Sequence, residues 1–203
     1  NQEISWGLKY FLDLLNLYSH HSFDLSKDGE WMKTDNSFHD ILLKELISTL
    51  NIGDKVLDVG CGLGRYMDVL KDKYQVYGID ISSHNVKICR NKKLNVASGS
   101  LTNYNLPKQY PSKFNLIYMI EAFEHAVFPG NAIAQARLHL KDNGKLIIID
   151  KDFYSCLDYR LCCFEQYFTK REYAKLALNN DMSILSFKKI GNFIMCTMVK
   201  KFK

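Results

Sequence analysis

The chain is poor in proline and has no long apolar run. Only 3 of its 203 residues are proline, and no Pro-rich linker, internal repeat or low-complexity tract divides it, which argues against several flexibly joined domains. No apolar run approaches the ~18–20 residues that would span a bilayer, so a membrane helix is not expected. No signal peptide is recognisable, and we expect a cytoplasmic protein.

The cysteines lack the spacing of a metal site or a disulfide framework. None of the six belongs to a Cys-x-x-Cys pair, and the adjacent Cys162 and Cys163 are poorly placed to bind one metal ion or each other. We therefore expect reduced thiols, mostly in the core. The net charge is also low, because a value of +5 permits an anionic substrate but does not demand one.

The chain does contain a regular alternation of apolar strands and amphipathic helices. With 203 residues and 47% hydrophobic side chains, it can bury one sizeable core. Helical spacing over 5–18 and 37–50 flanks a polar loop, and the alternation that follows predicts an α/β fold with a parallel sheet covered on both faces. The expected strands are 55–59, 75–79, 94–97, 114–120 and 144–149, and the expected helices are 64–72, 83–91 and 129–141.

The most informative stretch is a glycine-rich turn between two acidic residues. An apolar strand runs into Asp58, and Gly60, Gly62 and Gly64 follow at alternate positions. Because glycines have no Cβ, the backbone can turn sharply there and approach a ligand closely. A second apolar strand ends in Asp80, which is placed to accept hydrogen bonds from two ribose hydroxyls. The combination predicts a site for an adenosine that carries a cationic amino acid.

A dinucleotide is the main alternative ligand for such a turn. Its fingerprint is G-x-G-x-x-G, with the helix N-terminus facing a pyrophosphate. Here Gly64 comes one residue early, and Arg65 occupies the position where the third glycine is expected. Asp58 would also lie close to the anionic pyrophosphate, whereas it suits the ammonium and sulfonium of S-adenosylmethionine. The residues therefore favour S-adenosylmethionine over NAD.

Two segments, Val56–Gly64 and Tyr77–Ser82, resemble the first two signature motifs of the class I S-adenosylmethionine-dependent methyltransferases. A weaker resemblance extends from about Phe38 to the C-terminus. It is closest to the group that acts on small molecules, in which the fourth strand is often followed by Glu-His, as at Glu124-His125. The resemblance implies a Rossmann-like, doubly wound, mostly parallel seven-stranded sheet with an antiparallel C-terminal hairpin, and S-adenosylmethionine as cofactor.

The resemblance also implies which residues bind the cofactor, at the carboxyl ends of the strands. The family commonly has an acid after the third strand that contacts the adenine amino group, and this chain has Ser100 there. Ser100 or the amide of Leu101 would then contact the adenine without a charge-assisted bond. The predicted cofactor-binding residues are Asp58, Gly60, Cys61, Gly62, Gly64, Asp80, Ile81, Ser100, Leu101 and Glu121.

The segment after the fourth strand supplies the candidate catalytic residues. Methyl transfer from a sulfonium is an in-line displacement that depends on positioning, and a base is needed only when the acceptor carries a proton. His125 is the candidate base, because the ordinary pKa of histidine, ~6.5, lies near neutral pH. Glu124 or Glu121 is placed to orient it or to bind a cationic acceptor. The alternative is that Glu-His caps the strand or shapes the pocket wall.

Segments outside the alternating core are expected to close the pocket of a small-molecule acceptor. We divide the single methyltransferase domain, 1–203, into a helical lid (1–36), a cofactor-binding core (37–150), an acceptor-side insert and helix (151–182) and a β-hairpin (183–203). The hairpin strands are 183–189 and 193–199. Aromatic side chains with a few polar groups are typical of such pockets. The predicted substrate-binding residues are Tyr18, His21, Trp31, Tyr154 and Arg160.

Three alternatives are weighed beside this hypothesis. Glu121, Asp150 and Asp152 have the ligand type for a divalent cation, but no further spacing supports a site, and no metal is predicted. An RNA methyltransferase, acting on tRNA for example, is the second substrate class. Nucleic acid is not favoured, because the lysines between 188 and 203 form only a modest basic cluster. A non-catalytic cofactor-binding partner subunit is the third alternative. The sequence indicates neither the acceptor nor the oligomeric state.

Overall fold

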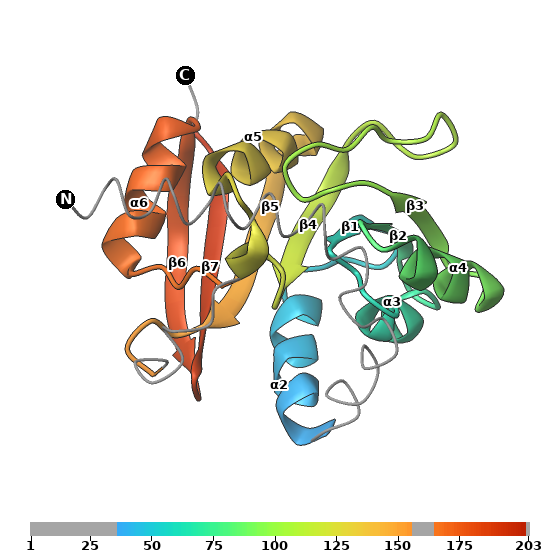
Figure 1. Ribbon diagram of the computed structural model, residues 1–203, viewed down its shortest axis with the longest axis horizontal. Coiled ribbons are helices and arrows are strands. Elements are labelled where there is room, and N and C mark those ends of the chain that lie inside the picture. The colour runs from blue at the N-terminus through green and yellow to red at the C-terminus, as the bar shows by residue number, and fades with distance from the viewer. Residues whose placement is uncertain (1–35, 156–164, 202–203) are drawn as a thin grey trace, which may run out of the picture.

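The computed structural model describes residues 36–155 and 165–201, which form a seven-stranded sheet with helices on both faces (Figure 1). The strand order is β3-β2-β1-β4-β5-β7-β6. In chain order the elements are α2 (Asn36–Ile47), β1 (Lys55–Val59), α3 (Arg65–Leu70), β2 (Gln75–Asp80), α4 (Ser83–Asn91), β3 (Asn95–Ser98), β4 (Phe114–Ile120), the short 3₁₀ helix η2 (Phe123–His125), α5 (Pro129–His139), β5 (Leu140–Lys151), α6 (Lys170–Asn179), β6 (Met182–Ile190) and β7 (Phe193–Lys200).

The pairing of the strands confirms the predicted doubly wound sheet with a C-terminal hairpin. Strand β1 pairs in parallel with β2 and β4, and the pairs β2–β3 and β4–β5 are also parallel. Strand β7 lies between β5 and β6 and is antiparallel to both. From β1 the chain adds β2 and β3 on one side of the sheet and then returns to add β4 and β5 on the other side. Open α/β sheets bind their ligands at such a point, beyond the carboxyl ends of the strands.

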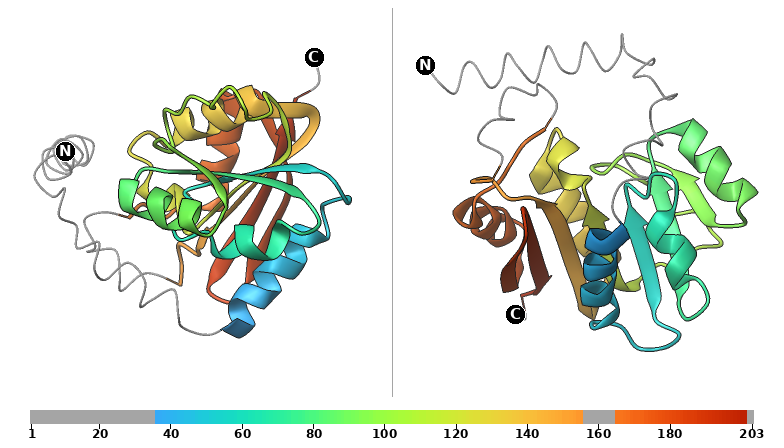
Figure 2. Two further views of the ribbon diagram at one scale, coloured as in Figure 1. Left: turned by 90° about the vertical axis from the view of Figure 1, so that its right-hand side faces the viewer. Right: turned by 90° about the horizontal axis from the view of Figure 1, so that it is seen from below.

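The helices bury one apolar core on each face of the sheet (Figure 2). Helices α5 and α6 cover one face with residues such as Ile133 and Tyr173. Helices α2, α3 and α4 cover the other with Leu42, Met67 and Val86. Because β1 and β4 are buried on both faces, they read as nearly continuous apolar runs. No helix in the described part of the chain is long and apolar enough to cross a bilayer.

The predicted element boundaries differ most from the structure at the start of β5. The sequence pattern predicts a helix over 129–141 and a strand from 144, but α5 ends at His139 and β5 begins at Leu140. Leu140 pairs with Phe114, and the β4–β5 register then shifts before the next pair. In this irregular stretch a Cβ on Gly144 would lie 2.9 Å from the Phe114 carbonyl oxygen. The close approach of β4 and β5 explains why position 144 is a glycine.

Two predicted helices before β1 have different outcomes. The helix expected over 37–50 is α2, which ends earlier, at Ile47. The helix expected over 5–18 and the polar loop after it lie outside the described residues. The structure therefore leaves the proposed helical lid as a prediction.

Candidate functional site

The glycine turn after β1 has a backbone that residues other than glycine rarely adopt. Gly60, Gly62 and Gly64 have φ angles of 85°, 52° and 77°, in the left-handed region. A Cβ on Gly60 would lie 2.6 Å from the Cβ of Ala122, so the turn contacts the segment that follows β4. The Gly60 amide donates to the Ile79 carbonyl oxygen at 2.8 Å. These contacts bring the carboxyl ends of β1, β2 and β4 together.

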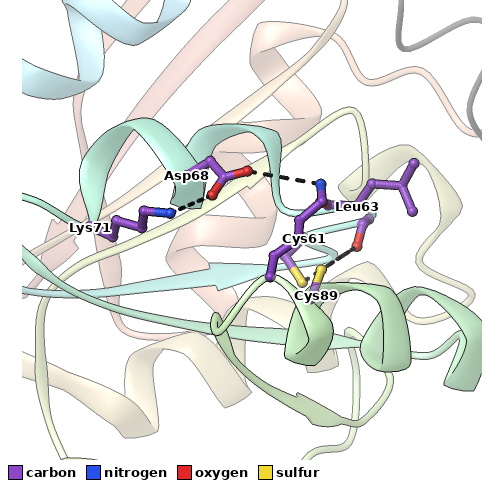
Figure 3. Close-up of polar contacts among 7 residues, drawn as sticks. Cys61, Leu63, Asp68, Lys71 and Cys89 are labelled. Atoms are coloured by element: carbon purple, nitrogen blue, oxygen red, sulfur yellow. Dashed lines mark hydrogen bonds and ion pairs between the residues drawn. The ribbon is translucent and has the colours of Figure 1, made fainter.

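The other side of this turn is held from α4 (Figure 3). The Cys89 thiol donates to the Gly62 carbonyl oxygen at 3.3 Å, beside the buried Cys61 side chain. The Lys92 ammonium donates to the Leu63 carbonyl oxygen at 2.8 Å. The neighbouring Cys89 thiol, together with burial, raises the pKa of Cys61. Cys61 therefore carries a neutral thiol that packs in the core, which argues against a nucleophilic role.

Gly64→Ala should destabilise the fold by about 1–3 kcal/mol. The added Cβ would lie 2.5 Å from Leu94 Cδ1 and 3.1 Å from Cys89 Sγ, at a φ of 77°. Gly53→Ala is the matched control, because its φ is 84° but nothing lies within 4 Å of the added Cβ, so only backbone strain is introduced. Urea unfolding measures both free energies. Equal losses would show that Leu94 and Cys89 move aside without cost.

The carboxylate of Asp80 joins the glycine turn to the start of α4. Its Oδ2 accepts a hydrogen bond from the Gly62 amide at 2.7 Å, and its Oδ1 accepts from the Ser82 amide at 2.8 Å. The Asn85 side-chain amide donates to the same Oδ1 at 3.4 Å. A carboxylate has about four acceptor positions, and these bonds use three of them on the side chain that the sequence predicts to accept from the ribose hydroxyls. The amides also fix the orientation in which Asp80 would meet them.

Asp58 is buried at the end of β1 and bonded to a tyrosine on β4. It is 2% exposed, and the Tyr118 hydroxyl donates to its Oδ2 at 2.8 Å. Burial raises the pKa of Asp58 well above the ordinary aspartate value, although the bond from Tyr118 opposes the shift. An ionised carboxylate in this position is stabilised by a cation beside it. The predicted ligand would supply one in its ammonium group. Sequence reasoning missed Tyr118, since it lies within an apolar strand.

A cavity of about 130 Å³ lies between α2 and α3, next to the glycine turn. Arg65 lines it, and its buried Nη1 has no hydrogen-bond partner among the described residues. The Tyr66 hydroxyl is 2.6 Å from His39 Nδ1 at the same cavity. A buried guanidinium nitrogen without a partner fits a carboxylate, and the amino-acid end of S-adenosylmethionine carries one. The sequence marked Arg65 only as unsuited to a dinucleotide.

The predicted catalytic segment begins directly after β4 and differs in burial along its length. Glu121 has a φ of 49°, and its amide donates to the Ile149 carbonyl oxygen at 2.8 Å. Glu124 is 2% exposed, whereas the His125 side chain is 48% exposed, and His125 Nε2 lies 3.7 Å from Glu124 Oε1. Burial raises the pKa of Glu124, although the charges of Lys151 and His125 oppose the shift. A buried carboxylate therefore lies behind an accessible imidazole.

Sequence reasoning gave no role to two residues that complete this end of the site, Lys151 and Glu165. The Lys151 ammonium lies 3.0 Å from Glu165 Oε2 and 3.6 Å from Glu124 Oε1. The Tyr167 hydroxyl donates to the same Glu165 carboxylate. Lys151 ends β5, where ligand-facing residues are expected, but no sequence pattern links it to Glu165. The result is a cluster of opposite charges beside His125.

Some of the remaining predicted site residues lie in the described part of the chain and others lie outside it. The Ser100 hydroxyl accepts from the Asn103 amide at 3.1 Å and so takes part in its own turn. Leu101 packs against Gly60, and Ile81 is 73% exposed directly after β2. Tyr154 is 66% exposed. Four predicted substrate-binding residues lie outside the described part of the chain: Tyr18, His21, Trp31 and Arg160.

The acids first considered for a cation at the strand ends have other partners. Asp150 accepts a hydrogen bond from the buried Tyr173 hydroxyl at 3.3 Å. Asp152 forms an ion pair with Lys189 at 2.7 Å. Each of these two carboxylates thus has a partner of its own. The arrangement does not bring these three acids together as a ligand set.

Comparison with known proteins identifies the family. A family model described as a methyltransferase domain matches residues 32–194. Over 101 residues the chain is 32% identical to a ubiquinone biosynthesis O-methyltransferase from Idiomarina loihiensis. That match covers 46% of this chain and 41% of the relative, so the chain spans less than half the length of this curated protein.

Solved structures share the fold. A S-adenosylmethionine-dependent methyltransferase from Clostridium acetobutylicum has a TM-score of 0.69 at 14% identity, covering 93% of this chain and 100% of that one. A chain in the complex of the Haloferax volcanii Trm112 methyltransferase activator with a methyltransferase has a TM-score of 0.67 at 14% identity, covering 79% and 88%. Family match, sheet topology and glycine turn agree: the chain belongs to the class I S-adenosylmethionine-dependent methyltransferases.

Proposed function

We propose that this methyltransferase transfers a methyl group to an oxygen or nitrogen of a small molecule. The observation that carries the proposal is the contact between Ala122 and Gly60, which joins the Glu121–His125 segment to the cofactor turn. An accessible histidine with a buried carboxylate behind it suits the removal of a proton from a small acceptor. The relative named as an O-methyltransferase supports the same acceptor class.

Four charged residues of this chain would hold the cofactor. S-adenosylmethionine supplies a methyl group on a positively charged sulfur, which is already activated for displacement. Asp80 would accept hydrogen bonds from the ribose hydroxyls, and Arg65 would pair with the carboxylate of the methionine portion. Asp58 and Glu121 would face its ammonium group. Burial raises the pKa of both acids, and such a positive charge beside them would favour their ionised forms.

His125 would act on the acceptor. Its ring would take the proton of a hydroxyl as the oxygen attacks in line, or the proton of an ammonium group before the freed nitrogen attacks. Glu124 Oε1, 3.7 Å from Nε2, would stabilise the imidazolium that forms. Glu124 would also limit the orientations of the ring. In this hypothesis His125 is the general base and Glu124 positions it.

Tyr118→Phe should weaken S-adenosylmethionine binding roughly tenfold, by about 1–1.5 kcal/mol. The change removes the hydrogen bond to Asp58 and makes its ionised form less favourable. Tyr104→Phe is the matched control, because that buried hydroxyl has no hydrogen-bond partner within the described residues. Isothermal titration calorimetry measures both affinities. A similar loss of affinity in both variants would show that cofactor binding does not depend on the hydrogen bond between Tyr118 and Asp58.

The basic C-terminal segment gives RNA little support as the substrate. Lys188 pairs with Glu45 at 2.9 Å, Lys189 with Asp152 at 2.7 Å, and Lys200 with Asp142 at 3.2 Å. Lysines that already neutralise acids contribute less to a nucleic-acid footprint. RNA is therefore the second substrate class.

The test is the production of S-adenosylhomocysteine across a panel of phenols, sugars, amines and carboxylates, with bulk tRNA as a separate arm. We expect turnover with at least one small-molecule class and none with tRNA. Asp80→Ala serves as the control for cofactor-dependent product. Turnover with tRNA, falling as salt is raised and absent across the panel, would replace the proposal with an RNA methyltransferase.

A further inference from the structure

Three side chains at the acceptor end of the site have the chemistry of metal ligands. A carboxylate oxygen of Glu124, a carboxylate oxygen of Glu165 and a ring nitrogen of His125 all lie within 4.8 Å of one another. Carboxylates and imidazoles gathered in this way commonly hold a divalent cation. The three come from η2 and from the segment before α6. The spacing alone therefore indicates a place for a positive charge.

A positive charge of the protein's own lies among these groups. The Lys151 ammonium is 3.0 Å from Glu165 Oε2 and 3.6 Å from Glu124 Oε1. It also lies 5.9 Å from the centre of the Tyr167 ring. Lys151 ends β5, so the sheet fixes the origin of its side chain. A metal ion bound by both carboxylates would have to displace this ammonium.

The surrounding acids make that positive charge necessary. Glu124 is 2% exposed, and its Oε2 has no hydrogen-bond partner among the described residues. Glu121 and Asp150 lie near enough to Glu124 for their negative charges to repel that of Glu124. Burial alone would lower the pKa of Lys151, but the charges of Glu124 and Glu165 outweigh it and raise the value. The Lys151 ammonium therefore has two carboxylate oxygens beside it, at 3.0 and 3.6 Å, to stabilise its charge.

We propose that Lys151 is a positioning residue that serves as an internal cation, in the place where a divalent metal would otherwise bind. Its ammonium joins Glu124, behind His125, to Glu165 in the segment before α6. The orientation of Glu124 is then set without a metal ion. The consequence for catalysis rests on the proposed role of His125, but the internal cation itself does not.

The experiment compares cation binding by the wild-type chain and by Lys151→Ala. Both are freed of metal with a chelator and titrated with Mn²⁺, followed by electron paramagnetic resonance and thermal unfolding. We expect no Mn²⁺ binding and no change in Tm for the wild type. Lys151→Ala should unfold at a lower temperature than the wild type, bind Mn²⁺ where the wild type binds none, and regain part of the lost Tm when Mn²⁺ is bound. Glu165→Gln in the Lys151→Ala background should abolish that binding.

Lys189→Met is the matched control, because it removes a lysine paired at 2.7 Å with Asp152 outside this cluster, and it should not create Mn²⁺ binding. Lys151→Arg should retain the Tm of the wild type, since it keeps the charge. If Lys151→Ala does not fold, Lys151→Gln takes its place. Mn²⁺ binding by the wild type that depends on Glu165, or no binding by either Lys151 variant, overturns the proposal. Mn²⁺ binding and Tm are both measured without an acceptor. The proposed acceptor class can therefore be wrong while the internal cation is right, and the reverse.

Discussion

Asp80→Ala should weaken S-adenosylmethionine binding by about 1.5–3 kcal/mol, roughly 10- to 150-fold in Kd. Two ribose hydroxyls would lose a charged acceptor. The Gly62 amide would also lose its partner at 2.7 Å, so the glycine turn would be less well fixed before the cofactor binds. Isothermal titration calorimetry with S-adenosylmethionine and S-adenosylhomocysteine measures the loss. Both ligands should be affected alike, because they share the ribose.

The control separates the effect of the Asp80 carboxylate from the effect of the N-cap of α4, which is Ser82. Ser82→Ala removes the side-chain acceptor of the Asn85 amide, at 3.3 Å, and leaves Asp80 in place. That change loosens the start of α4, and cofactor affinity should stay within about twofold of the wild type. Urea unfolding confirms that both variants are folded. Unchanged affinity in a folded Asp80→Ala variant would show that Asp80 does not contact the ribose.

The sequence predicts the glycine turn well because backbone conformation limits which residues can occupy it. Gly60, Gly62 and Gly64 all adopt positive φ, and the alternation of three glycines is a local pattern that requires no knowledge of distant contacts. The strand ends at Asp58 and Asp80 are local signals as well. Because parallel strands finish at the same edge of the sheet, two such signals predict one site.

The partners of these residues could not be predicted, because they depend on contacts between distant parts of the chain. The hydroxyl of Tyr118 reaches Asp58 across two paired strands, yet its strand reads as continuously apolar. Lys151 and Glu165 come together only when β5 and the segment before α6 are placed. No periodicity encodes such pairs. Their discovery requires the packed structure.

The start of β5 illustrates a different limit. Residues after His139 continue a helical pattern in sequence, but Leu140 pairs with Phe114 in the sheet. Pairing with a neighbouring strand outweighs local helix propensity. Gly144 signals the close approach only once β4 is seen beside it. Such tertiary contacts decide boundaries that a local pattern cannot.

His125→Ala should lower kcat by roughly 10²–10⁴-fold with cofactor affinity almost unchanged, the usual contribution of a positioned base. The His125 side chain is 48% exposed and lies beside the buried Glu124, so its removal leaves the core packing intact. Turnover is measured with the acceptor found in the panel, and cofactor affinity by calorimetry. His139→Gln is the control histidine variant, because His139 ends α5 and stacks on Tyr104, away from the glycine turn.

His125→Gln tests proton transfer separately from hydrogen bonding. Glutamine keeps a hydrogen-bonding side chain of similar length but cannot take a proton at neutral pH. If His125 is the base, this variant should be as slow as His125→Ala. A neutral amine or an ionised carboxylate as acceptor needs no base, and both substitutions would then mainly raise KM. Near-wild-type kcat for His125→Gln on the true acceptor would therefore assign His125 to the pocket wall.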